Sequence, residues 1–348
     1  MSRALILSAG LRLERVNASK RFSNGVFHNT AEVGSGLKPG TAFSTMGEYF
    51  TGDASRKPPA PLPFESPLER WSKKPETGLR ATWLGHSTTL VEIDDAKILT
   101  DPVWGDRASP FSFMGPKRFQ PVPVAIEALP RLDAIIVSHD HYDHLDAPTI
   151  QQLAKRDTPF FTSLGVGAHL ERFGVEPERI HELDWWEERS VPGTGVTITA
   201  APSQHFSGRG IKRNTTLWSS FAMRGPTHRV FFSGDTGLTP EYSEIRQRLG
   251  PFDLVMLEVG AWHPSWGDIH LGPENALKAL DLLGGGAFLP VHWGTFNLAL
   301  HAWDEPAETL VRLARSPLLM PRLGTAVEPA RAEKLDIWWR EVTQKQLR

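Results

Sequence analysis

Cysteine is absent from this sequence of 348 residues. The absence excludes disulfide bonds, zinc sites built on cysteine and catalysis by a thiol nucleophile. It does not assign a redox compartment, because a chain without cysteine folds in either environment. Long apolar runs are missing as well, since none approaches the roughly 18 residues that cross a bilayer as a helix. The chemistry of this chain therefore rests on residues other than cysteine.

An excess of charge of either sign is also missing. The 38 Lys and Arg residues nearly balance the 40 Asp and Glu residues, which gives a formal net charge of −2. Such a chain has no global positive field, although a local basic patch is compatible with it, and we expect no nucleic-acid partner. Hydrophobic content of 40% and charged content of 22% are those of an ordinary globular protein.

The first ten residues form only a weak signal-peptide pattern. Their apolar stretch is short, and Arg12, Glu14 and Arg15 follow directly. A secretory signal needs about 7–15 apolar residues before a small-residue cleavage site. We therefore expect a cytoplasmic protein.

Residues 1–77 differ in composition from residues 78–348. Five prolines lie between residues 57 and 67, where they disfavour helix and central strand and favour an extended path. Seven aromatic residues between Phe22 and Trp71 favour packing against the rest of the chain, since disordered segments are usually poor in aromatics. We predict an extended N-terminal arm followed by one large domain, and a disordered leader is the alternative.

From residue 79 onward, short β-rich runs alternate with helical patterns. The runs that predict strands are 79–84, 88–93, 96–100, 133–138, 159–162, 195–201, 216–223, 228–233, 253–259 and 286–292. The segments that predict helices are 147–156, 165–173, 240–249, 273–283 and 305–315. Strand clusters separated by helices predict an α/β fold in which sheets lie between helical layers.

The densest chemical signal is the pattern H-x-H-x-D-H, formed by His139, His141, Asp143 and His144. It follows the apolar run 134–137, so these side chains are expected in the loop where a strand ends. Imidazole nitrogen and carboxylate oxygen are ligands that zinc prefers, and catalytic zinc sites keep a position open for water. The alternative is a solvated polar loop that happens to be rich in histidine.

Three later residues share the same local setting, an apolar run followed by a tight turn. They are His205, Asp235 and His292. Each is weak evidence alone, because a histidine at a strand end is more often a hydrogen-bonded structural residue. Together with the first motif they supply seven candidate ligands, which is enough for two metal ions.

These ligands in this order resemble those of the metallo-β-lactamase fold. Within that superfamily the chain is similar to the phospholipase D group that hydrolyses N-acylphosphatidylethanolamine. The segments that carry this similarity are Trp-Leu-Gly-His-Ser-Thr-Thr-Leu-Val-Glu at 83–92, Leu-Thr-Asp-Pro at 99–102, Arg-Ala-Ser-Pro at 107–110, Met-Gly-Pro-Lys-Arg-Phe at 114–119, Gly-Asp-Thr-Gly at 234–237 and Val-His-Trp-Gly-Thr-Phe at 291–296. The similarity covers about residues 79–300. Asp140 stands where the animal enzymes have Asn, at a position that is not a ligand.

The resemblance implies an αβ/βα four-layer sandwich that holds two zinc ions, although the ligand types also suit manganese or iron. The first zinc would be bound by His139, His141 and His205, and the second by Asp143, His144 and His292. Asp235 would bridge both, because a carboxylate can bind two cations at once. Asp143, Asp235 and His270 are the predicted catalytic residues, with His270 orienting the substrate or protonating the leaving group. For His86 and Asp101 we expect a supporting role, such as orienting a ligand imidazole.

The implied function is hydrolysis of a phosphodiester, with N-acylphosphatidylethanolamine as the favoured substrate, by attack of a hydroxide held between the metals. A lactonase or amide hydrolase of the same fold is the main alternative, because one fold hosts many reactions. A nuclease and a non-catalytic metal-binding module are less favoured. The sequence indicates no oligomeric state.

A phospholipid substrate also implies peripheral contact with a membrane. Trp104, Trp262, Trp266 and Trp293 lie in or beside the predicted site loops, and indoles suit a membrane interface. The alternative is that these tryptophans pack in the core or in the wall of an ordinary pocket.

Overall fold

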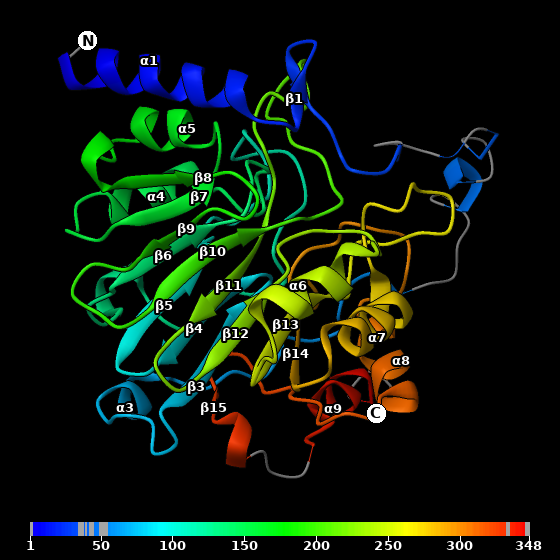
Figure 1. Ribbon diagram of the computed structural model, residues 1–348. Coiled ribbons are helices and arrows are strands. Elements are labelled where there is room, and N and C mark those ends of the chain that lie inside the picture. Colours follow the sequence, from blue (N-terminus) through cyan, green and yellow to red (C-terminus); the bar gives the residue numbers. More distant parts are fainter. Residues whose placement is uncertain are drawn as a thin grey trace.

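The computed structural model of the protein describes residues 3–33, 38, 40–41, 45–48, 55–331 and 335–344. Two large sheets form the centre of the molecule (Figure 1). In spatial order, the seven-stranded sheet contains β15 (Ala326–Val327), β3 (Leu79–Gly85), β4 (Thr88–Ile93), β5 (Ala96–Thr100), β6 (Ala134–Val137), β7 (Phe160–Ser163) and β8 (Ile180–Leu183). The six-stranded sheet contains β14 (Ala287–Val291), β13 (Leu254–Glu258), β12 (Arg229–Phe232), β11 (Ser220–Arg224), β10 (Thr197–Ala201) and β9 (Glu188–Ser190).

Helices cover the outer faces of the two sheets (Figure 1). α4 (Ala147–Leu153) and α5 (Gly167–Arg172) lie beside the seven-stranded sheet, and α6 (Glu241–Leu249), α7 (Gly272–Leu283) and α8 (Glu305–Leu313) lie beside the other. The predicted αβ/βα four-layer sandwich is therefore confirmed. The remaining short helices are α3 (Leu68–Trp71), α9 (Trp338–Gln344), η1 (Ile126–Ala128), η2 (Pro177–Arg179) and η3 (Pro329–Arg331).

Alternating side chains of the central strands build two separate cores. In β6, Ala134 and Ile136 point into the core between the sheets, together with residues of β10 to β14. Ile135 and Val137 point the other way and pack with residues of α4 and α5. All four residues of β6 are buried, as expected for a strand covered on both faces. The continuous apolar run of β6 thus contributes alternate side chains to both cores.

Each sheet is mixed, and its parallel portion positions the ends of several strands at one edge. β5, β6, β7 and β8 are parallel neighbours, and so are β12, β13 and β14. The carboxyl ends of parallel strands meet at the same edge of a sheet. The loops after these strands therefore gather at one end of the sandwich.

The N-terminal region departs from the extended arm expected from the sequence, because Arg3–Ala18 form a helix, α1. This segment is rich in Ala, Leu and Arg, which have the highest helix propensities. α1 lies across the molecule beside α5 (Figure 1). The Arg12 guanidinium is 2.7 Å from a Glu171 oxygen and 2.6 Å from a Glu182 oxygen. α1 is followed by the short hairpin of β1 (Phe22–Ser23) and β2 (Val26–Phe27).

The proline-rich part of the predicted arm contains no regular strand or helix in residues 55–66 beyond one isolated bridge. That bridge joins Phe64 to Leu323. Residues 1–2, 34–37, 39, 42–44 and 49–54 of the predicted arm lie outside the described residues, so the division of the chain at residues 77 and 78 stays a prediction. Among the described residues, no helix has the length and apolar character needed to span a membrane.

One buried ion pair joins the first two strands of the central domain. Arg80 and Glu92 are direct register partners in β3 and β4, and each side chain is only 4% exposed. Arg80 Nη2 donates a hydrogen bond of 2.8 Å to Glu92 Oε1. Removing one partner of such a pair leaves an uncompensated buried charge, whereas removing both does not.

We predict that Arg80→Met lowers the free energy of unfolding by about 3–5 kcal/mol. The double variant Arg80→Met/Glu92→Met should recover most of this loss, because no charge is then left buried without a partner. Urea denaturation of both variants measures the difference. An equal loss in the single and double variants would contradict this account of the pair.

Candidate metal centre

The seven predicted ligands come together at the end of the sandwich where the parallel strands finish. His139, His141, Asp143 and His144 follow β6. The others follow strands of the opposite sheet: His205 follows β10, Asp235 follows β12 and His292 follows β14. Both sheets therefore contribute to one site, and side chains more than 150 residues apart meet there.

Three overlapping groups of candidate donors lie here, and the third, Asp235, Glu258, His270 and His292, shares two members with the other two. The first group consists of His139, His141, His205 and Asp235. Each offers one donor atom, and these atoms all lie within 4.8 Å of one another. His139 Nε2 is 2.9 Å from His141 Nδ1, and His205 Nε2 is 3.2 Å from the same Nδ1. This spacing places the three imidazole nitrogens around one point.

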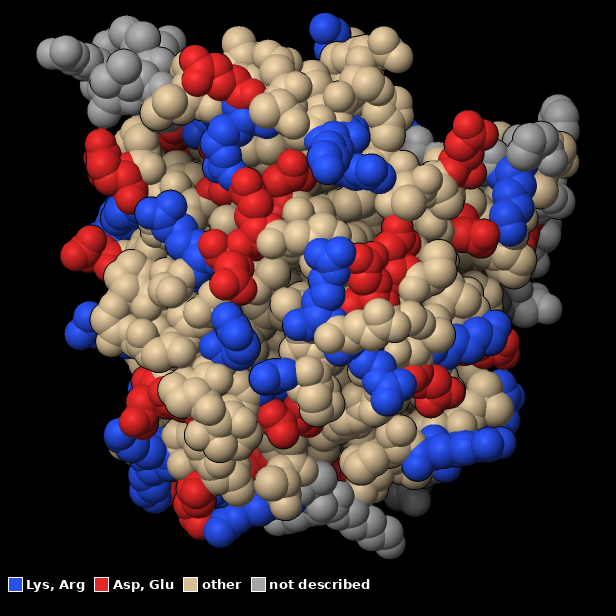
Figure 2. Space-filling view, viewed as in Figure 1, with Lys and Arg blue, Asp and Glu red and all other residues tan. Residues whose placement is uncertain are grey.

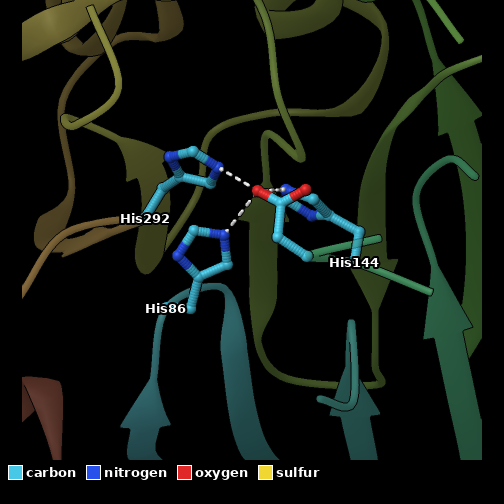
Figure 3. A group of neighbouring side chains, drawn as sticks. His86, His144 and His292 are labelled. Carbon is cyan, nitrogen blue, oxygen red and sulfur yellow. Dashed lines mark hydrogen bonds and ion pairs between the residues drawn. The ribbon is translucent and has the colours of Figure 1, made fainter. Parts of the chain in front are cut away.

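The second group consists of His86, Asp143, His144 and His292, again with donor atoms within 4.8 Å of one another. Figure 3 shows the three imidazoles aimed at one carboxylate. Asp143 Oδ2 is 2.9 Å from His86 Nε2, 3.4 Å from His144 Nε2 and 3.3 Å from His292 Nε2. His86 was expected to orient an imidazole, and the structure places it against the Asp143 carboxylate instead.

Asp235 lies between the two groups. Its Oδ1 is 3.2 Å from both His144 Nε2 and His292 Nε2. Its Oδ2 is 3.9 Å from His139 Nε2 and 3.7 Å from His205 Nε2. One oxygen of this carboxylate therefore faces each group, which is the arrangement that a bridging ligand requires.

Several donor atoms in this centre have no hydrogen-bond partner within the described residues. They are His144 Nε2, Asp235 Oδ1 and both ring nitrogens of His292, all of them buried. A buried polar atom without a partner is costly and calls for a specific explanation. A bound cation would satisfy His144 Nε2, Asp235 Oδ1 and the Nε2 atom of His292, whose Nδ1 instead lies 3.8 Å from Glu258 Oε2. These nitrogen and oxygen donors match the ligand preference of zinc, manganese and iron. The residues present therefore fit a centre for two divalent metal ions.

Neighbouring groups fix the orientation of the candidate ligands. Asp101 Oδ2 lies 2.6 Å from His144 Nδ1 and accepts a 2.6 Å hydrogen bond from the Ser138 hydroxyl. His205 Nδ1 donates to the backbone oxygen of Ile269 at 2.8 Å. Each of these contacts leaves Nε2 as the free nitrogen of its ring. Asp101 thus makes the contact expected from the sequence, since such partners set the tautomer of metal-binding histidines.

The backbone around the centre is strained. His86, Asp101 and His292 have φ values of 54°, 34° and 64°, a region that residues with a Cβ seldom adopt. Such conformations cluster at functional sites, where the surrounding structure enforces them. Gly234, next to Asp235, has a φ of 55°, and a Cβ there would lie 2.7 Å from the Ser138 Cβ. Only glycine allows the end of β12 to approach the end of β6 this closely.

Glu258 is a residue of the centre that the sequence analysis missed. It ends β13, is fully buried, and its Oε2 lies 2.7 Å from His270 Nδ1. Its Oε1 accepts hydrogen bonds from the backbone nitrogens of Thr236 and Leu271. The one local signal for Glu258 was an acidic residue at the end of an otherwise apolar strand. Its partner, His270, lies 12 residues further along the chain.

Burial and the Glu258 carboxylate act in opposite directions on His270. Burial lowers the pKa of His270, but Glu258 outweighs it and raises that pKa above the ordinary imidazole value. Burial likewise raises the pKa of Glu258. His270 is therefore held against a buried acid, with a pKa above that of a free imidazole.

The metal centre opens into a cavity of about 350 Å³. Its polar side is formed by His141, Asp143, Asp235, His270 and His292, and its apolar side by Phe206, Ala261, Trp266, Ile269 and Leu298. A site that combines a few convergent polar groups with apolar walls is the usual form of a small-molecule or lipid pocket.

None of the four tryptophans expected near the site is fully exposed. Trp104, Trp262 and Trp266 are half-buried, and Trp293 is buried. Trp266 lines the cavity, whereas Trp293 stacks on Trp83 with ring centroids 5.4 Å apart. These positions favour the alternative of core packing and pocket wall over direct contact with a membrane.

The two groups differ in their proton affinity before metal binds. Burial lowers the pKa of His139 and His205 well below the ordinary value. Burial also acts on His292, but the Asp235 and Asp143 carboxylates outweigh it and raise the pKa of His292 to about 10. The same two carboxylates hold the pKa of His144 well above the ordinary value despite its burial. The first group is therefore ready to bind a cation as neutral imidazoles, and the second is not.

Comparison with known proteins agrees with this fold. The Beta-lactamase superfamily domain matches residues 96–293, more than half of the chain. The chain therefore belongs to this superfamily, as a metal-dependent hydrolase with the metallo-β-lactamase fold.

Among its relatives, an uncharacterized protein of Mycobacterium tuberculosis is 46% identical over 300 residues, which cover 84% of this chain and 80% of the relative. The N-acyl-phosphatidylethanolamine-hydrolyzing phospholipase D 1 of Caenorhabditis elegans is 40% identical over 250 residues, which cover 68% of this chain and 70% of the relative. The crystal structure of isothiocyanate hydrolase from Delia radicum gut bacteria has a TM-score of 0.59 at 22% identity, covering 72% of this chain and 98% of that one. At that identity the last comparison supports the fold alone.

We predict that the two metal ions bind with different proton release. At about pH 8, His292 should lose a proton when zinc enters the second group, because its pKa is raised to about 10 by the Asp235 and Asp143 carboxylates. Zinc entering the first group should release few protons. Zinc affinity of the second group should therefore fall more steeply as the pH is lowered.

Calorimetric titration with zinc in buffers of different ionisation enthalpy measures this release for each binding step. His292→Ala should remove part of the release from the second step and leave the first step unchanged. Equal proton release in both steps would contradict the assignment.

Proposed function

We propose that this protein is a binuclear zinc phosphodiesterase that hydrolyses N-acylphosphatidylethanolamine to phosphatidic acid and an N-acylethanolamine. The observation that carries the proposal is Asp235, whose two oxygens face two separate ligand groups. The similarity to the phospholipase D of Caenorhabditis elegans supports the choice of substrate. The apolar half of the cavity, formed in part by Phe206, Trp266 and Leu298, is suited to the acyl chains of a lipid.

His139, His141 and His205 would hold one zinc ion, Asp143, His144 and His292 the other, and Asp235 both. Two divalent cations held by these residues would lower the pKa of a bound water and would stabilise the negative charge that develops on the phosphate oxygens. Buried ligands in a water-poor setting strengthen that stabilisation, since charge interactions weaken in water. Asp143 and Asp235 act first as ligands, and Asp143 takes up a proton only in a second role.

His270 is the residue best placed to protonate the leaving oxygen. It lines the cavity, and its Nδ1 is engaged by the buried Glu258 at 2.7 Å, which leaves Nε2 as its remaining ring nitrogen. A protonated imidazole can donate from Nε2 to the alkoxide of the departing N-acylethanolamine. Glu258 orients this ring and stabilises its positive charge, as buried carboxylates do for catalytic histidines.

The first test is product analysis of zinc-loaded protein incubated with N-acylphosphatidylethanolamine in mixed micelles of a nonionic detergent. We expect phosphatidic acid and N-acylethanolamine by mass spectrometry. In water labelled with heavy oxygen, the label should enter phosphatidic acid, because attack at phosphorus breaks the bond to the ethanolamine oxygen. Asp235→Asn should lower the rate by at least about a thousandfold, since a neutral amide does not balance two cations.

The control for that variant is its metal content, measured by elemental analysis. Near-wild-type activity in Asp235→Asn would contradict the bridging assignment. Wild-type protein that carries two metals and yields no phosphatidic acid would contradict the proposed substrate, and hydrolysis of a lactone or amide by the same protein would replace it.

A second prediction concerns His270. His270→Gln should lower kcat on the lipid by about a hundredfold, the usual contribution of a general acid. The loss should be much smaller on a nitrophenyl phosphodiester, whose leaving group needs no proton. His181→Gln, a histidine on β8 away from the site, serves as the matched control. An equal loss on both substrates would show that His270 supports the structure and does not act as the acid.

A further inference from the structure

Two loops at the rim of the cavity expose apolar side chains on their tips. The first loop, residues 107–117, is closed at its base by an antiparallel bridge between Arg107 and Lys117. At its tip, Phe111 is 47% exposed, Phe113 75% and Met114 55%. The two phenylalanine rings lie 5.5 Å apart, so they form one apolar tip.

The second loop, residues 206–214, presents Ile211, whose side chain is completely exposed. Its base is firmly held, because the Arg209 guanidinium donates to the backbone oxygens of Asp140 at 2.8 Å and Leu145 at 2.7 Å. The same guanidinium lies over the Tyr142 ring at 4.0 Å. A large apolar side chain is therefore displayed on a braced loop.

Both loops begin beside the cavity. Phe206, the first residue of the second loop, lines the cavity wall. Directly after the first loop, the Phe119 nitrogen donates to the Thr295 oxygen at 2.8 Å, and Arg118 is bridged to Phe296. The same chain segment continues to Leu298, which lines the cavity. Each loop thus adjoins a chain segment that contributes to the cavity wall.

The charge of these loops differs from that of the protein as a whole. No Asp or Glu occurs in residues 107–126 or 203–218, while Arg107, Lys117, Lys212 and Arg213 are exposed or half-buried there. The whole chain has a formal net charge of −2, and on the face drawn in Figure 2 acidic and basic residues are interspersed. The rim loops therefore combine apolar tips with a local positive charge.

We propose that residues 107–117 and 206–214 form a docking surface for an anionic lipid bilayer. The apolar tips would enter the acyl region, and the flanking cations would contact the headgroups, the combination by which proteins attach to membrane interfaces. A protein partner is less favoured, because the exposed side chains project from separate loop tips and protein interfaces bury a contiguous patch. The inference rests on the proposed function, since a lipid substrate that resides in a bilayer gives such a surface its use.

Vesicle co-sedimentation tests the apolar tips. The probes are vesicles of phosphatidylcholine alone and of an equal mixture with phosphatidylglycerol. Phe113→Ser combined with Ile211→Ser should lower the partition coefficient on the mixed vesicles by about tenfold or more, because two large side chains no longer leave water. Leu313→Ser, which changes an exposed leucine at the end of α8, is the matched control and should bind as the wild type does.

The charge contribution is tested with Lys212→Gln. This variant should bind mixed vesicles about fivefold more weakly, the effect of one cation near an anionic surface. On phosphatidylcholine alone it should match the wild type. Binding of the wild type to mixed vesicles should weaken as salt is raised.

The results separate this inference from the proposed function. Asp235→Asn should bind vesicles as the wild type does, and the double loop variant should keep its rate on a short-chain substrate in micelles while losing rate on vesicles. Vesicle binding without lipid hydrolysis would support the docking surface and contradict the proposed substrate. Unchanged partitioning in the double variant would overturn the docking surface. If light scattering shows that the double variant has a changed oligomeric state while it still binds vesicles, the docking surface is overturned. The loops would then mediate contact between two copies of the chain.

Discussion

The organisation of the site depends on one buried carboxylate, Asp235, placed between two groups of imidazoles. Four histidine nitrogens lie between 3.2 and 3.9 Å from its two oxygens, two on each side. Without cations these atoms could not share so small a volume cheaply, since several of them have no other partner among the described residues. Under the proposed function two cations would balance this carboxylate, and the neighbouring groups hold their donor atoms where such cations would bind.

The positions of these donor atoms follow from the architecture of the two sheets. Strands that end at one edge deliver their next residues into a common space, and strained backbone at His86, Asp101 and His292 directs side chains into it. Two further buried acids, Asp101 and Glu258, lie behind the centre and hold His144 and His270 through their Nδ1 atoms. The protein thus uses two kinds of carboxylate: those that face the cavity as candidate ligands and those that fix the rings around it. Asp101, Asp235 and Glu258 are buried and Asp143 is half-buried, so water screens their charges only weakly.

Sequence patterns predicted the strands and the loop whose positions depend on residues close together in the chain. Each of the ten predicted strands corresponds to an observed strand because its apolar run is buried on both faces, and the H-x-H-x-D-H loop follows β6 as its spacing indicated. β8 and β9 were missed because they are partly or wholly polar edge strands. α1 was not predicted, because the first ten residues were interpreted only as a weak signal-peptide pattern. The contacts of Glu258 with His270 and of His86 with Asp143 could not be predicted, because no local pattern states which way a strand-end side chain will point.

Arg209 and Gly208 join the second loop, residues 206–214, to the turn that carries three of the candidate ligands. The Arg209 guanidinium holds the backbone oxygens of Asp140 and Leu145, which bracket three of the candidate ligands, and the amide of Gly208 donates to the Asp140 carboxylate at 2.7 Å. The loop that displays Ile211 is thus braced against the same turn that carries His141, Asp143 and His144. A force on the loop tip from a lipid surface would be borne at its base by these hydrogen bonds and by the stacking of Arg209 on Tyr142. The candidate ligands can therefore keep their geometry while the exposed loop tip contacts a lipid bilayer, as the proposed docking surface requires.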